Sequence, residues 1–108
     1  MSSHRFQLTY SITHLSDTEK SLTAAKQVRD KIARTQFENW TKVEKVETTF
    51  KGTFYLRKLY LDDRKTEAED IVRMAFGNIM SELNASLEVW AHCSLMVEGL
   101  GESLEFSF

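Results

Sequence analysis

The feature that most constrains the fold is residues 87–98, where apolar side chains occupy every second position. Successive side chains of a β-strand point to opposite faces, so period two predicts a strand with one face in a core. A glycine-bracketed turn follows, and residues 103–108 resume the alternation. The two stretches predict a pair of antiparallel strands with one buried face. The inward set of the longer strand is predicted to be Leu87, Val89, Ala91, Cys93, Leu95 and Val97.

The outward set of the same stretch contains two large apolar side chains. Trp90 and Met96 fall on the face expected to meet water, with His92 between them. Tryptophan and methionine are enriched at the centres of protein interfaces, which have a polar rim. Unless another part of the chain covers this face, the pattern predicts a protein interface made by Glu88, Trp90, His92, Met96 and Glu98.

The N-terminal region predicts a strand followed by a helix. Residues 5–12 alternate with period two and predict a half-buried strand. Ser16 and Glu19 then have capping-box spacing, which predicts a helix over about residues 17–37 with Ser16 as its N-cap. The inward residues of the strand are predicted to be Phe6, Leu8, Tyr10 and Ile12, and those of the helix Leu22, Ala25, Val28 or Arg29, Ile32 and Gln36 to Phe37.

The middle of the chain is open to two interpretations. Residues 43–50 are rich in β-branched side chains, and residues 53–61 are apolar on both alternating sets. Two strands joined by a tight reversal at Gly52 would explain the pattern, because glycine permits such a turn. The alternative is one long, bent strand that passes through Gly52.

A second helix is predicted to end near Asn84. Thr66 and Glu69 have capping-box spacing, and Asp62 or Asp63 is the alternative, earlier cap. Its apolar stripe has steps of three and four and consists of Ala68, Ile71, Val72, Ala75, Ile79 and Leu83, widened by Phe76 and Met80.

Together these elements predict one α+β domain over residues 1–108. The order β-α-β-β-α-β, with one extra C-terminal strand, is typical of a ferredoxin-like fold. We therefore expect an antiparallel sheet with two helices on one face and nothing on the other. A chain of 108 residues with 42% hydrophobic content is long enough to bury a core without disulfides or a structural metal.

Composition also bears on the compartment. The single cysteine, Cys93, excludes an intrachain disulfide and is compatible with a reducing environment. No apolar run is long enough to span a membrane, and residues 1–10 do not have the pattern of a signal peptide. We expect a cytoplasmic protein without a membrane partner.

This layout resembles the Cas2 and GhoS-type antitoxin group of ferredoxin-like domains. The shared features are a first strand that ends in an aromatic residue, Tyr10, and a second strand that starts at Trp40 in "WTKVEKVETTF". The resemblance implies a homodimer in which the last strand adds to the partner's sheet. Cas2-like nucleases carry a metal-holding aspartate after the first-strand aromatic, but this chain has Ser11, a poor ligand for hard cations.

The charge distribution limits binding to nucleic acids. Residues 1–54 hold nine Lys/Arg and six Asp/Glu, whereas residues 55–108 hold five and ten. An extended phosphate-binding surface usually has more positive charge. Basic residues interleaved with aromatic residues in the middle strands form a local candidate site: Lys45, Lys51, Arg57 and Lys58.

Reactive and metal-binding patterns are absent from the sequence. Cys93 falls on the inward set and His92 on the outward set, so the two cannot pair as nucleophile and base. The three histidines lack metal-ligand spacing, and the acidic residues 62–70 suit the start of a helix. We expect no cofactor and no metal.

The sequence thus predicts a non-enzymatic protein-interaction module. We expect a homodimer that also binds another protein, as small antitoxins, immunity proteins and inhibitors do. The alternative is an RNA-binding or metal-dependent RNA-cleaving regulator of the Cas2/GhoS type.

Overall fold

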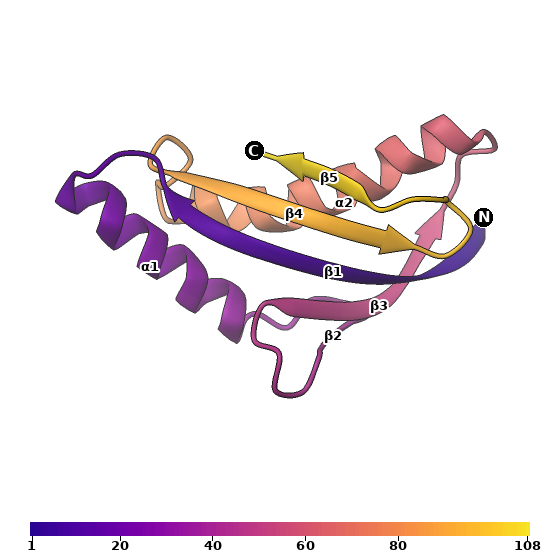
Figure 1. Cartoon of the computed structure of the whole chain (residues 1–108), viewed down its shortest axis with the longest axis horizontal. Helices are drawn as coiled ribbons and strands as arrows, with labels where there is room; N and C mark the ends of the chain where they lie inside the picture. The colour runs from indigo at the N-terminus through magenta and orange to yellow at the C-terminus, as the bar shows by residue number, and fades with distance from the viewer.

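The computed structural model describes residues 1–108 and contains five strands and two helices (Figure 1). In chain order they are β1 (Ser2–His14), α1 (Glu19–Arg34), β2 (Trp40–Lys42), β3 (Thr49–Leu56), α2 (Leu61–Glu82), β4 (Val89–Val97) and β5 (Leu104–Ser107). This β-α-β-β-α-β-β order confirms the predicted α+β, ferredoxin-like layout.

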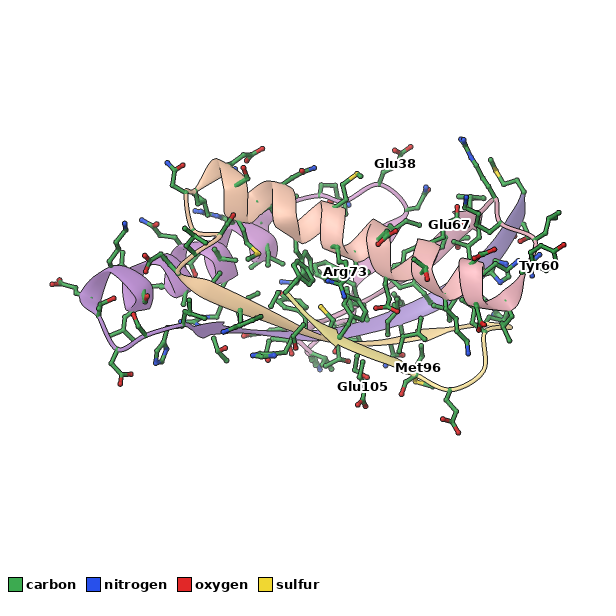
Figure 2. All side chains as sticks on the ribbon, turned by 90° about the horizontal axis from the view of Figure 1, so that it is seen from above. Glu38, Tyr60, Glu67, Arg73, Met96 and Glu105 are labelled. Atoms are coloured by element: carbon green, nitrogen blue, oxygen red, sulfur yellow. The ribbon has the colours of Figure 1, made fainter.

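The five strands form one antiparallel sheet in the order β2-β3-β1-β4-β5. The long strand β1 is central, because it pairs with β3 over residues 2–9 and with β4 over residues 6–14. Both helices lie on one side of the sheet (Figure 2). The other side is open, as the alternation predicted.

A hydrophobic core of 25 buried residues lies between the sheet and the helices. The inward residues of β1, Phe6, Leu8, Tyr10 and Ile12, are all buried, as predicted. Six aromatic rings form its densest part. The ring centroid of Trp40 lies 4.8 to 6.2 Å from those of its neighbours Phe6, Phe37, Phe50, Phe54 and Phe76. Burial of aromatic side chains stabilises the packing of α2 against the sheet.

Helix α1 begins later than the capping-box pattern predicted. Its N-cap is Thr18, whose side chain accepts a hydrogen bond from the Ser21 N–H at 3.2 Å, so the prediction of Ser16 as the cap is wrong. The buried face of the helix includes Ser21, Ala24 and Ala25 in place of Leu22, which is 46% exposed. The packing of α1 against the rest of the fold turns Ser21 inward, where its hydroxyl donates to Glu88, and leaves Leu22 toward solvent.

The alternative interpretation of the middle of the chain is correct at Gly52 but not over its whole length, because residues 43–48 form a turn and not part of a strand. Strand β3 runs without a break through Gly52, and the predicted reversal there is wrong. The chain reverses instead at residues 43–48, where Lys45 has a φ of 65°. The preceding strand β2 has only three residues, beginning at Trp40 as expected.

Helix α2 starts earlier than either cap prediction. Its N-cap is Tyr60, with no hydrogen bond from a side chain, so Asp62, Asp63 and Thr66 are not the cap. The Glu67 carboxylate accepts hydrogen bonds from the backbone N–H groups of Arg57 and Lys58 at 3.0 and 3.1 Å. These bonds take the donors that a longer β3 would need, so the strand ends at Leu56 and not at residue 61.

The start of β4 also differs from the prediction. A turn in which Glu88 N–H donates to Ala85 O at 2.9 Å delays the strand until Val89. Leu87, predicted to point inward, is 84% exposed. No helix in the structure is both long enough and apolar enough to cross a membrane.

Candidate protein interface on the open sheet face

The open face is mostly polar and slightly hollowed. A shallow depression of about 610 Å³ lies over β1, β4 and β5. The side chains that line it alternate with the core residues of these strands and are Thr9, Ser11, His92, Ser94, Glu105 and Ser107. Figure 2 shows Met96 and Glu105 pointing away from both helices.

His92 is held at the centre of this face by two hydroxyl groups. Its Nε2 lies 3.0 Å from Thr13 Oγ1, and its Nδ1 lies 2.8 Å from Ser107 Oγ. Hydroxyls can donate or accept, so the arrangement fits either neutral tautomer of the imidazole. No carboxylate contacts the ring, so the arrangement lacks the orienting acid of a Ser-His-Asp triad.

Trp90 and Met96 remain exposed on the open face, at 43% and 60%. The Trp90 ring lies beside His92, with centroids 6.4 Å apart and planes at 23°. Trp90 and Met96 are six residues apart on β4, which corresponds to about 20 Å along a strand. They are therefore two separate apolar contacts, with His92 and Ser94 between them, and not one continuous apolar centre.

Glu98 lies on the open face and is already paired. Its Oε2 accepts hydrogen bonds from Arg5 Nη2 at 2.7 Å and from Arg5 Nε at 3.1 Å. The hydrogen bonds and charge of Arg5 hold the pKa of the Glu98 carboxyl below its usual value. Glu98 and Arg5 thus form a polar pair at the edge of the candidate interface. The sequence did not indicate that Arg5 is the partner of Glu98.

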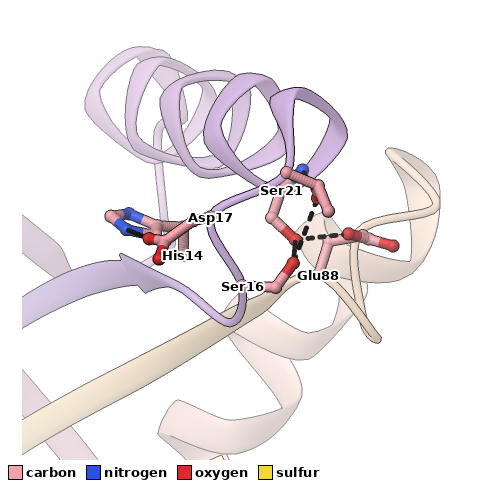
Figure 3. Close-up of polar contacts among 6 residues, drawn as sticks. His14, Ser16, Asp17, Ser21 and Glu88 are labelled. Atoms are coloured by element: carbon pink, nitrogen blue, oxygen red, sulfur yellow. Dashed lines mark hydrogen bonds and ion pairs between the residues drawn. The ribbon is translucent and has the colours of Figure 1, made fainter.

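Glu88 does not belong to the open face, which corrects the predicted set. Its Oε2 accepts a hydrogen bond from Ser21 Oγ at 2.5 Å, and Ser21 Oγ also contacts Ser16 Oγ at 2.9 Å (Figure 3). These contacts join the first turn of α1 to the turn before β4. Period two failed here because Glu88 precedes the strand, so its direction is set by the turn.

Cys93 lies in the core beneath the open face. Burial raises the pKa of its thiol to about 12, against a smaller opposing effect of the Arg73 charge. The thiolate is the reactive form of cysteine. Cys93 is therefore a packing residue and not a nucleophile at neutral pH.

We expect the Cys93 thiol to resist alkylation in the folded protein, because it is both buried and protonated. Iodoacetamide treatment at mildly alkaline pH, followed by mass spectrometry, should leave the native mass unchanged. The same treatment in urea should add one adduct. Rapid labelling without denaturant would contradict the buried position of β4.

The predicted basic residues do not share one surface. Lys51 lies exposed on β3, whereas Lys45 is in the 43–48 turn and Arg57 and Lys58 follow β3. The aromatic residues expected to accompany them, Trp40, Phe50 and Phe54, are buried in the core. Only Tyr55 and Tyr60, at 50% and 75% exposure, remain available for stacking on bases.

The histidines and acidic residues do not assemble a metal site. His4 bonds Glu98 O at 2.8 Å, His14 lies 3.4 Å from Asp17, and His92 is between its two hydroxyls (Figure 3 shows His14 and Asp17). No three His, Cys, Asp or Glu side chains come close enough together to hold a metal ion.

Thr13 and Ser107 are the contributors to this face that sequence reasoning missed. Alternation along β1 and β5 places both outward, but their contact with His92 depends on the pairing of three strands. Comparisons of the chain with protein-family models, with curated proteins and with solved structures find no match.

Proposed function

We propose that this chain is a non-enzymatic protein-interaction module that pairs with a second copy of itself through the open face of the sheet. The observation that supports the proposal is the exposure of Trp90 and Met96 on a face that neither helix covers. Side chains of these types are enriched where proteins meet. The Arg5–Glu98 pair supplies part of a polar rim, and the hydroxyl groups around His92 lie between the two apolar contacts.

A two-fold axis that runs perpendicular to β4 and crosses it at Cys93 would make the two open faces self-complementary. Trp90 and Met96 are equally far from that point along the strand, so Trp90 of one copy would meet Met96 of the other. A sulfur–aromatic contact of this kind is favourable. The same axis would place Glu105 over Ser107 of the second copy and not over another carboxylate, because the two residues flank Phe106, the partner of Cys93.

The proposal extends to a second, different protein partner, bound in the manner of an antitoxin, immunity protein or inhibitor. Helix α2 lies outside the open face and carries six Asp/Glu and three Lys/Arg. This surplus of acidic groups suits a partner with a basic surface. Kinship with the Cas2/GhoS-type group would fit such a role, and the shared β-α-β-β-α-β-β layout is what supports it.

Trp90→Ala is expected to make the free energy of self-association less favourable by about 2 kcal/mol or more, which is typical of an aromatic hot spot. Met96→Ala should weaken it less, and a double-mutant cycle of the two should give a coupling energy, because the pairing brings them into contact. Sedimentation equilibrium over a range of concentrations measures both effects.

Met74→Ala is the control, because Met74 is a large apolar side chain that is 68% exposed on helix α2, on the side of the sheet opposite the open face. It should leave the dimer constant unchanged. A wild-type protein that stays monomeric at all concentrations, or a Trp90→Ala variant that dimerises as well as wild type, would refute open-face pairing.

The RNA-binding or RNA-cleaving alternative stays a prediction with narrower support. The observation in its favour is Lys51 on the open face, with Tyr55 exposed on the same strand. If it holds, single-stranded RNA should bind at low salt, and Lys51→Ala should weaken the binding. Affinity should fall steeply as salt rises. A flat response to RNA at low salt would remove this alternative.

A further inference from the structure

The two ends of the elongated molecule each expose a cluster of large apolar side chains. The chain measures 44 by 28 by 22 Å, with the β3–α2 connection at one end of the long axis. The β1–α1 and α2–β4 connections lie at the other end (Figure 1). Neither cluster belongs to the open face, and neither has a role in the proposed function.

The first end, here called the basic tip, consists of Arg57, Lys58, Leu59, Tyr60 and Leu61. Its three consecutive apolar residues are 81%, 75% and 49% exposed, and Figure 2 shows Tyr60 at the extremity. Runs of exposed apolar residues are unusual on a folded surface unless they serve a function.

The basic tip is held in shape by helix α2. The Glu67 carboxylate bonds the backbone N–H groups of Arg57 and Lys58, and Arg64 Nε donates to Lys58 O at 2.8 Å. Because the backbone is fixed at its base, little ordering would be needed when the tip binds a partner. With Glu67 included, residues 57–67 hold four Lys/Arg against three Asp/Glu, so the tip has a net charge of +1.

The opposite end, here called the leucine end, consists of Leu15, Leu22 and Leu87. They are 47%, 46% and 84% exposed. Two bonds bring their three segments together: Leu15 N–H donates to Glu88 O at 2.9 Å, and Glu88 accepts from Ser21 Oγ. The charged residues around the leucine end give it a negative net charge, because there are three acidic residues, Asp17, Glu19 and Glu88, and one basic residue, Lys20.

We propose that the basic tip of one molecule binds the leucine end of another copy. Each end offers what the other lacks, since an apolar surface with positive charge meets an apolar surface with negative charge. The contact is heterologous, so copies joined in this way form open chains or a closed ring. Each end has a cross-section of 28 by 22 Å, and this area is smaller than the roughly 800 Å² that each partner buries in a standard interface. We therefore expect weak association.

This contact is independent of open-face pairing, and the test keeps the two apart. Sedimentation velocity is measured for the full chain in a Trp90→Ala background, over a wide range of concentrations and at low and high salt. We expect the average mass to rise with concentration beyond that of a dimer. High salt should weaken the association, because it screens the opposite charges.

Leu59→Ser removes the tip's most exposed side chain, and Leu87→Ser removes that of the leucine end. Each variant alone should associate about tenfold more weakly, the factor expected for losing a buried leucine contact. An equimolar mixture should form pairs, because one variant keeps an intact tip and the other an intact leucine end. Met74→Ser, an exposed α2 change away from both ends, is the matched control and should behave as the background does.

Circular dichroism shows whether each variant is folded. A mass that does not change with concentration, or a mixture that fails to pair, overturns the proposal. If the chain instead sediments with anionic phospholipid vesicles and Leu59→Ser abolishes this, the basic tip binds a lipid surface and the proposal is wrong. If the wild-type protein grows end to end and its association is the same as that of the Trp90→Ala background, only the proposed function is refuted.

Discussion

Gly52→Ala is expected to lower the free energy of unfolding by about 3 kcal/mol, the upper range for overpacking a well-packed site. A Cβ at this position would lie 2.0 Å from Asn39 O and 2.9 Å from Phe6 Cε1. Asn39 O is a backbone atom that already accepts a hydrogen bond from Thr53 N–H, so it cannot move without disturbing that bond. The short strand β2 should therefore detach from β3. Urea unfolding, followed by tryptophan fluorescence, measures the loss.

Gly77→Ala is the matched control and should have the opposite sign. Gly77 lies inside helix α2, and a Cβ there would meet no atom within 4 Å. Alanine is favoured over glycine in helix interiors by roughly 1 kcal/mol, so this variant should be more stable than wild type. Equal effects of the two substitutions would show that β2 does not lie against Gly52 as described.

Phe76→Ala is expected to reduce the free energy of unfolding by about 3 to 5 kcal/mol. Phe76 is fully buried and joins helix α2 to the sheet, with its ring centroid 5.0 Å from that of Tyr10 and 6.1 Å from that of Trp40. Removing it would leave a cavity among aromatic rings that cannot collapse without moving the helix. Thermal and urea unfolding monitored by circular dichroism give the change.

Met74→Ala on the same helix controls for the loss of a large side chain without a cavity. Met74 is 68% exposed, so its removal should change stability by less than about 0.5 kcal/mol. If Phe76→Ala were no more harmful than Met74→Ala, the aromatic cluster would not be the centre of the core.

The candidate interface was only partly predictable. Period two placed Trp90, His92 and Met96 on one face, because that rule is local to a strand. The hydroxyls of Thr13 and Ser107 reach His92 across neighbouring strands, so only the register reveals them. Glu88 was assigned to the same face, but its direction follows from a turn and from the contact with Ser21 on α1.

The sequence by itself determined the α+β class, the inward set of β1 and the open face, because alternation and helical spacing are properties of neighbouring residues. Only the tertiary structure decided where β3 and α2 meet, and which aromatic residues are available to a partner. Glu67 ends β3 by binding N–H groups nine and ten residues earlier. Trp40, Phe50 and Phe54 are buried in the core because the chain reverses at residues 43–48 and not at Gly52. These outcomes depend on contacts between distant residues, which no local pattern encodes.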